Sequence, residues 1–152
     1  ICLEGFQAGL SWITILKRRE GFRKAFKNFD IKKIAKFTDS DIDRLMQDER
    51  IIRNRAKIVS AVKNANIVLE MAKQGESISQ LIWQFAPPAS KRTSPAKNFE
   101  WLAVSPESEA ISKALRSRGF SFVGPTTMYA LMQSIGMIND HAPGCFRRKE
   151  LA

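Results

Sequence analysis

The sequence predicts an all-α fold, and three observations support this prediction. Apolar residues recur at helical spacing from the first residues onward, no apolar–polar alternation lasts more than a few positions, and glycine or proline separates the helical segments. The chain has 152 residues, of which 44% are hydrophobic and 26% are charged. Such a chain is long enough to bury a core of its own. We therefore expect a single helical domain over residues 1–152.

Apolar periodicity and capping residues place the helices of the first half. Leu3 and Phe6 begin an apolar helical face that Gly5 interrupts, so we expect a first helix that ends near Gly5. Ser11 is a suitable N-cap for a second helix that runs to about Arg19. Five more helices are predicted, over residues 22–29, 31–37, 39–48, 53–73 and 77–86.

The second half contains a long connection followed by a further helix. Residues 87–106 hold four prolines together with serine, threonine and lysine, a composition typical of a surface loop rather than a strand. The next helix opens at Ser105 or Pro106 and runs to about Ser117.

A glycine-bounded segment, residues 119–124, then joins two helices. Glycines at both ends permit positive φ and hence a tight hairpin, and Pro125 suits the first position of the helix that follows. Free backbone N–H groups at that helix start can bind a DNA phosphate. The same pattern also fits a plain corner between two helices with a capping glycine. The candidate phosphate-binding residues are Arg118, Gly119, Gly124, Thr126 and Thr127.

Charge and cysteine content narrow the class of partner and compartment. The net charge is +10 and the sequence pI is about 10.0, which favours a polyanion such as nucleic acid or an anionic membrane surface. A basic protein can also carry such charge for solubility alone. Two cysteines are too few for a disulfide framework and suit a reducing cytoplasm. No apolar run approaches the roughly 18–20 residues of a membrane span.

The single histidine of the chain, His141, lies four residues before Cys145. Imidazole and thiolate are good zinc ligands, and structural zinc needs four ligands in a tetrahedron. Cys2 and carboxylates are the other candidates in the sequence, so a complete site is not evident. The alternative is a loop histidine beside an incidental cysteine.

Glu4 is an acid among apolar residues, close to a glycine-containing bend that ends at Trp12. A carboxylate with an aromatic wall can bind a flat, cationic or hydrogen-bonding ligand in a cavity. The alternative is a solvated acid and a core tryptophan, and the stretch alone does not distinguish the two.

These segments together resemble the DNA-3-methyladenine glycosylase I family, bacterial base-excision repair enzymes of the helix–hairpin–helix class. The resemblance rests on ICLEGFQAGLSWITILKRRE, IIRNRAKI, SKALRSRGFSFVG and YALMQSIGMINDH with the cysteine after it, in the family's order and spacing. It covers essentially the whole chain. It implies a helical DNA glycosylase fold and hydrolysis of the N-glycosidic bond of 3-methyladenine in double-stranded DNA, without a lyase step, by a monomer.

The resemblance also implies roles for individual residues. Glu4 matches the pocket glutamate that hydrogen-bonds the adenine edge, and Trp12 matches the tryptophan that stacks on the methylated ring. Gly9 and Leu10 fall in the turn that wedges into the gap left by the flipped base. Two of the four ligands of a structural zinc ion match His141 and Cys145, and the hairpin that supports the phosphate maps to Gly119 through Gly124.

The sequence departs from the family at its N-terminus. It opens on Ile1, already inside an apolar helical pattern, so we expect a missing N-terminal segment that in the family holds the other two zinc ligands and aromatic pocket residues. With two ligands, zinc should bind weakly or not at all. One alternative function is therefore a catalytically impaired, DNA-binding remnant of the same fold, and a weaker one is a basic helical protein that binds RNA or a protein partner.

Overall fold

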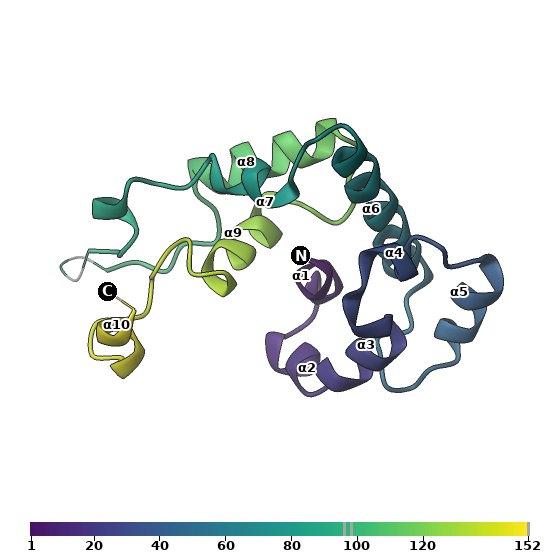
Figure 1. Cartoon of the computed structure of the whole chain (residues 1–152). Coiled ribbons are helices and arrows are strands. Elements are labelled where there is room, and N and C mark those ends of the chain that lie inside the picture. The colour runs from purple at the N-terminus through teal and green to yellow at the C-terminus, as the bar shows by residue number, and fades with distance from the viewer. Residues whose placement is uncertain (96, 98, 152) are drawn as a thin grey trace.

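The computed structural model describes residues 1–95, 97 and 99–151, and in this part of the chain it is helical without a strand (Figure 1). The all-α prediction is therefore confirmed. The α-helices are α1 (Cys2–Gln7), α2 (Trp12–Leu16), α3 (Arg19–Ala25), α4 (Ile31–Ile34), α5 (Asp39–Met46), α6 (Arg55–Lys73), α7 (Ile78–Trp83), α8 (Pro106–Ser117), α9 (Pro125–Ser134) and α10 (Phe146–Glu150). Two short 3-10 helices, η1 (Lys27–Phe29) and η2 (Ala89–Lys91), complete the set.

The buried side chains form two hydrophobic clusters that α6 connects. The first cluster gathers α1 to α5, and the second gathers α7, α8, α9 and the segment between α8 and α9. Ile58 and Ala65 of α6 belong to the first cluster, whereas Met71 belongs to the second. Figure 1 shows α6 running from the group that contains α4 and α5 to the group that contains α7 and α8. Because one helix packs in both clusters, it sets their spacing.

Helix α1 is held in place by aromatic packing in the first cluster. The ring centroids of Phe6 and Phe22 lie 4.7 Å apart, and those of Phe6 and Phe26 lie 5.7 Å apart, both in edge-to-face geometry. All three rings are almost completely buried. Such pairs add to the stabilisation that burial alone provides. They fix α1 against α3 and so determine which way the polar residues of α1 face.

The prediction that the first helix ends near Gly5 is wrong. Gly5 lies inside α1, where its amide donates to the Ile1 carbonyl over 3.0 Å, and the chain turns only after Gln7. The space around Gly5 explains the residue, since a Cβ there would lie 3.4 Å from the Cβ of Phe122. The glycine therefore allows close packing against the segment between α8 and α9 rather than ending the helix.

Other predicted helices end earlier in the structure than in the sequence analysis. The helix predicted over residues 22–29 gives way to η1 after Ala25, because Lys27, Asn28 and Phe29 all have φ between 52° and 58°. The second helix ends at Leu16 rather than near Arg19, and α4, α5 and α7 stop at Ile34, Met46 and Trp83. Helix α10 was not predicted.

The helices with strong caps are the ones that the sequence placed most accurately. The Asn54 side chain accepts a hydrogen bond from the Lys57 amide over 3.1 Å at the start of α6. Ser105 and Ser108 form a reciprocal capping box at the start of α8, with Pro106 in the first turn. These local interactions act within four residues, so sequence reveals them.

The predicted surface connection, residues 87–106, contains no strand in its described part, and residues 96 and 98 lie outside that part. Its backbone nevertheless pairs with the C-terminal region: the Ser94 amide donates to the Asn139 carbonyl over 2.9 Å, and the Asn139 amide to the Arg92 carbonyl over 2.7 Å. This isolated bridge ties the connection to the segment that follows α9. Among the described helices, none is both long and apolar enough to cross a membrane.

Packing between α3 and the segment before α6 leads to a first prediction. A Cβ at Gly21 would overlap the Arg50 carbonyl oxygen and lie 2.7 Å from the Arg50 Cβ. We expect Gly21→Ala to destabilise the protein by about 1–3 kcal/mol, because the backbone must shift to relieve the overlap. Urea unfolding followed by circular dichroism measures the effect. Glu20→Ala, on the exposed face of the same helix, is the control and should change stability by about 0.5 kcal/mol at most; equal effects of the two substitutions would contradict the prediction.

Candidate active site

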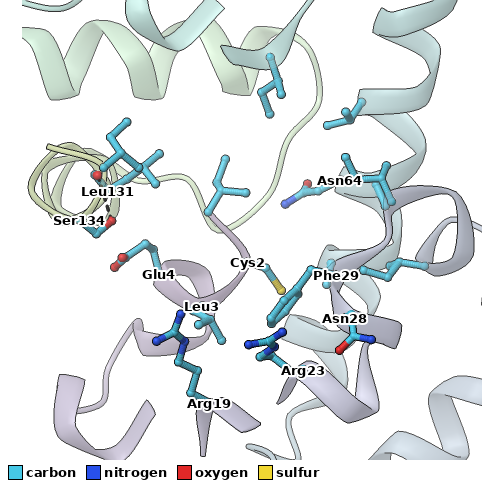
Figure 2. A pocket seen from close by; sticks show the side chains of 18 of the residues that line it. Cys2, Leu3, Glu4, Arg19, Arg23, Asn28, Phe29, Asn64, Leu131 and Ser134 are labelled. Carbon is cyan, nitrogen blue, oxygen red and sulfur yellow. Dashed lines mark hydrogen bonds between the residues drawn. The ribbon is translucent and has the colours of Figure 1, made fainter. Parts of the chain in front are cut away.

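A cavity of about 670 Å³ lies between the two hydrophobic clusters (Figure 2). Its lining is largely apolar and comes from α1, α2, α3, α4, α6, α7, α9 and the segments between them. A second cavity of about 460 Å³ reaches Gln133, Asp140 and His141 beyond α9. Glu4 and Trp12 line both cavities, so the two residues that the sequence singled out stand at the junction between them.

Glu4 lies on α1 with only 5% of its surface exposed. Figure 2 shows its carboxylate beside Ser134 of α9, at the wall of the larger cavity. Burial raises the pKa of Glu4 above its ordinary value, and the Ser134 hydroxyl partly offsets that rise. A buried carboxylate is stabilised by a positive or hydrogen-bond-donating partner. The Glu4 carboxylate therefore suits a cationic ligand group with N–H donors, whereas Arg19 and Arg23 bring positive charge to another part of the same lining.

Trp12 is half-buried at the first position of α2. It packs against the first hydrophobic cluster, and it also lines both cavities. The sequence allowed either a core tryptophan or a cavity-wall tryptophan, and Trp12 is partly both. The ring is supported by the core and also forms part of a cavity wall, which an aromatic ligand needs for stacking.

The turn between α1 and α2 presents Gly9 and Leu10 at the surface. Gly9 has a φ of 77°, which a glycine adopts without strain, and no atom lies within 4 Å of where its Cβ would be. Leu10 is 40% exposed, and its amide donates to the Gln7 carbonyl over 2.6 Å. We call residues 8–11 the wedge turn. It is tightly bonded at its base and carries an apolar side chain toward solvent.

Residues 119–124, the hairpin, connect α8 to α9. Phe120 and Val123 are buried in the second cluster and hold it against the core. Gly119 has a φ of 88°, and Phe122 is in the same left-handed region at 56° although it is not a glycine. Gly124 is the N-cap of α9 and Pro125 its first residue, as the sequence predicted. The first amides of α9, including those of Thr126 and Thr127, belong to the helix turn whose N–H groups have no partner within the helix.

Two arginines, Arg116 and Arg118, lie next to the hairpin and have different neighbours. Arg118 binds Glu76 through Nε and Nη2, at 3.3 and 3.2 Å, so its charge already has a partner. The Nη2 of Arg116 instead lies 3.5 Å from where a Cβ at Gly124 would sit. Nothing in the sequence singles out Arg116, because it lies eight positions before Gly124 and only the turn after α8 brings the two together.

His141 and Cys145 are brought together as the sequence suggested. The Nδ1 of His141 and the Sγ of Cys145 lie 3.7 Å apart. Tetrahedral zinc with ordinary Zn–N and Zn–S bonds separates such atoms by about 3.6 Å, so the pair fits two corners of a zinc site. Over residues 1–95, 97 and 99–151, no cluster of three or more histidine, cysteine or acidic residues could hold a metal ion.

A buried polar cluster beside this pair was missed by the sequence analysis. Asp140 accepts hydrogen bonds from the Tyr129 hydroxyl over 3.0 Å and from the Gln133 side chain over 2.8 Å. Arg148 donates to the His141 carbonyl over 2.5 Å. These contacts fix the loop that carries His141 to α9 and α10. Spacings of seven and eleven residues across a turn give no sequence signal that could reveal them.

Comparison with known proteins finds relatives of similar sequence and of similar structure. The DNA-3-methyladenine glycosylase of Haemophilus influenzae is 50% identical over 152 residues, covering 95% of this chain and 78% of the relative. The DNA-3-methyladenine glycosylase 1 of Escherichia coli is 46% identical over 145 residues, covering 95% and 78%. A crystal structure of a 3-methyladenine DNA glycosylase I superposes with a TM-score of 0.88 at 44% identity, covering 95% of this chain and 80% of that one. A variant in complex with 3-methyladenine superposes with a TM-score of 0.86 at 32% identity, covering 97% and 79%.

The helical glycosylase fold expected from the resemblance is therefore confirmed. The family model for methyladenine glycosylase matches residues 1–148. The chain belongs to the methyladenine glycosylase family.

Proposed function

We propose that this chain is a base-excision repair enzyme that hydrolyses the N-glycosidic bond of 3-methyladenine in alkylated double-stranded DNA. The observation that carries the proposal is the junction of Glu4 and Trp12, where a buried carboxylate and a supported aromatic ring line the same two cavities. A flat, positively charged base fits both groups. Membership of a family whose relatives are named for this base supports the same substrate.

The target base must leave the helix before it can reach this site. Duplex stacking hides it, so an enzyme of this kind extrudes the nucleotide and holds it in a pocket. Leu10, exposed on the wedge turn, enters the gap that the base leaves. The hairpin holds the neighbouring phosphate through the free amides at the start of α9, at Gly124, Thr126 and Thr127, with Arg116 beside them.

The chemistry requires little acid catalysis. Methylation at N3 places a positive charge on the base, so when the C1′–N9 bond breaks, its electrons neutralise the leaving group. A water molecule then bonds to C1′ and loses its proton to solvent, which leaves an abasic site. Trp12 stacks on the cationic ring and Glu4 accepts a hydrogen bond at its edge. The protein thus acts by recognition, desolvation and charge complementarity, and the leaving group needs no proton.

Glu4→Gln tests this role directly. We expect release of 3-methyladenine from alkylated duplex to fall about 10- to 100-fold, because a charge-assisted hydrogen bond to the cationic base is lost. Base release under single-turnover conditions is the measurement. Unchanged release would contradict the role of Glu4, and release absent from the wild-type chain would contradict the proposed function.

The same substitution should stabilise the folded protein. A raised pKa means that folding disfavours the ionised carboxylate and so lowers the free energy of unfolding. This loss of stability is absent when the pH is below the pKa of Glu4 in the unfolded chain, and it is complete when the pH is above the pKa of Glu4 in the folded protein. Glu4→Gln should therefore raise Tm at pH 7 and leave it nearly unchanged at pH 3.5, as measured by differential scanning calorimetry. A lower Tm at pH 7 would show that the carboxylate stabilises the fold instead.

The pH dependence of base release follows from the same group. Protonation of Glu4 removes the negative charge, so release should be lost as pH falls through a pKa above the ordinary 4.5 of glutamate. This acid limb of the pH profile should be absent in Glu4→Gln. An acid limb that is identical in the two proteins would assign it to another group.

We infer further that His141 and Cys145 supply two of the four ligands of a structural zinc ion. Their 3.7 Å separation supports this, and a bound zinc would tie the His141 loop to the start of α10. Because two ligands bind zinc weakly, the 152-residue chain should contain well below one zinc per molecule by elemental analysis. Supplying a cysteine and a histidine on an added upstream segment should raise the content to one. Stoichiometric zinc in the shorter chain would contradict the inference.

The remaining features of the proposal concern state and compartment. We propose that the enzyme acts as a monomer on double-stranded DNA in the cytoplasm. Neither Cys2 nor Cys145 forms a disulfide in the described part of the chain, and two cysteines without a disulfide suit a reducing compartment.

A further inference from the structure

Lys57 is a buried lysine that the proposed mechanism does not use. Only 7% of its surface is exposed, and its Nζ donates to the Phe6 carbonyl over 2.9 Å and to the Ala8 carbonyl over 2.5 Å. These carbonyls lie in the last turn of α1 and at the residue that follows it. A cation at a helix C-terminus satisfies carbonyls that have no partner in the helix and interacts well with the helix dipole. The ammonium is thus a C-terminal cap supplied from α6.

No carboxylate pairs with Lys57 among the described residues. Its other close partner is the ring of Phe122, whose centroid lies 6.0 Å from Nζ. Burial accordingly lowers the pKa of Lys57. A buried cation without an acidic partner is costly, so the carbonyls and the ring must offset its desolvation.

The same side of α6 also holds the hairpin. Asn64, two helical turns after Lys57, donates to the Ser121 carbonyl over 3.0 Å and accepts from the Ser121 amide over 3.0 Å. This amide-to-backbone pair fixes the hairpin on the helix. One face of one rigid helix therefore holds both the wedge turn, through Lys57, and the hairpin, through Asn64.

We propose that Lys57 is a positioning residue that holds the wedge turn at a fixed place relative to the hairpin, and that its ammonium does not contact DNA. The inference rests on the proposed function, since it gives the wedge turn and the hairpin their roles. With a phosphate held at the hairpin, Leu10 can enter the base stack only if the distance between the two elements is fixed. Catalytic arrangements tolerate errors of only about 0.5 Å, and the ammonium holds the backbone at Ala8, one residue before Gly9.

Lys57→Met tests the proposal, because it keeps the length of the side chain and removes the donors. Base extrusion is followed by the fluorescence of 2-aminopurine placed beside the target adenine in duplex DNA, and base release under single-turnover conditions. We expect the fluorescence rise to be largely lost and release to fall about 10- to 100-fold. Affinity for undamaged duplex, and the slope of that affinity against salt concentration, should stay unchanged.

Three further variants serve as comparisons for this result. Lys73→Met removes an exposed lysine from the far end of the same helix and should leave extrusion and release unchanged. Asn64→Ala should lower duplex affinity as well as extrusion, because the hairpin is then no longer fixed to α6. Lys57→Arg keeps the charge and the donors, and should recover most of the extrusion that Lys57→Met loses.

Several outcomes would overturn the proposal. A salt slope reduced by about 0.9 in Lys57→Met would show that Lys57 contacts a phosphate. Normal extrusion in that variant would show that the wedge turn does not depend on it. If the wild-type chain raises the fluorescence of 2-aminopurine beside the target base but releases no 3-methyladenine, the proposed function fails while the positioning role stands.

Hydrogen exchange in the free protein keeps the test independent of DNA. Loss of the ammonium should speed exchange of the Leu10 amide, which lies at the wedge turn, and leave the Ser121 amide protected by Asn64. If Lys57→Met does not fold, the same comparison is made with Lys57→Arg, in which modestly faster exchange should be confined to the wedge turn. Unchanged exchange at Leu10, or equal changes at both amides, would contradict the proposal.

Discussion

The position of α1 between the two hydrophobic clusters is the constraint on which the candidate active site depends. Phe6 anchors the helix in the first cluster through edge-to-face contacts with Phe22 and Phe26. The opposite side of the helix then meets α9, so that Glu4 lies beside Ser134 and faces a cavity. Because the helix is short, its orientation comes from this packing and not from its own hydrogen bonds. The position of the Glu4 carboxylate therefore depends on the burial of Phe6, two residues further along the chain.

Helix α6 extends this dependence to the DNA-binding surface. It packs in both clusters, and its polar side carries Lys57 and Asn64, which bond to the wedge turn and the hairpin. The two elements proposed to contact DNA are loops, and loops alone would position a base poorly. Hydrogen bonds to a single rigid helix give them a common reference. In this helical fold, two loops thus obtain a fixed geometry from their hydrogen bonds to α6.

Stability and function oppose each other at Glu4. Burial raises the pKa of the carboxylate, which is the sign of a group that the folded protein holds at a cost. The same burial removes competing water and strengthens its interaction with a cationic base. In the proposed function, this cost is offset when a cationic base binds beside Glu4. The lining of the larger cavity is largely apolar, and its polar members include Arg19, Arg23 and Asn64 besides Glu4.

Helices that depend on interactions between nearby residues could be predicted from the amino-acid sequence alone. The all-α class, α6 with its Asn54 cap and α8 with its Ser105 capping box follow from interactions within four residues. The resemblance of the sequence to the family also brought Glu4, Trp12 and the hairpin to notice. Only the tertiary structure showed that Gly5 lies inside a helix, that Arg116 rather than Arg118 lies at Gly124, and that Lys57 caps α1 across 51 positions of the chain. Such contacts depend on how helices pack, and helical periodicity shows which residues face the core without showing what they meet there.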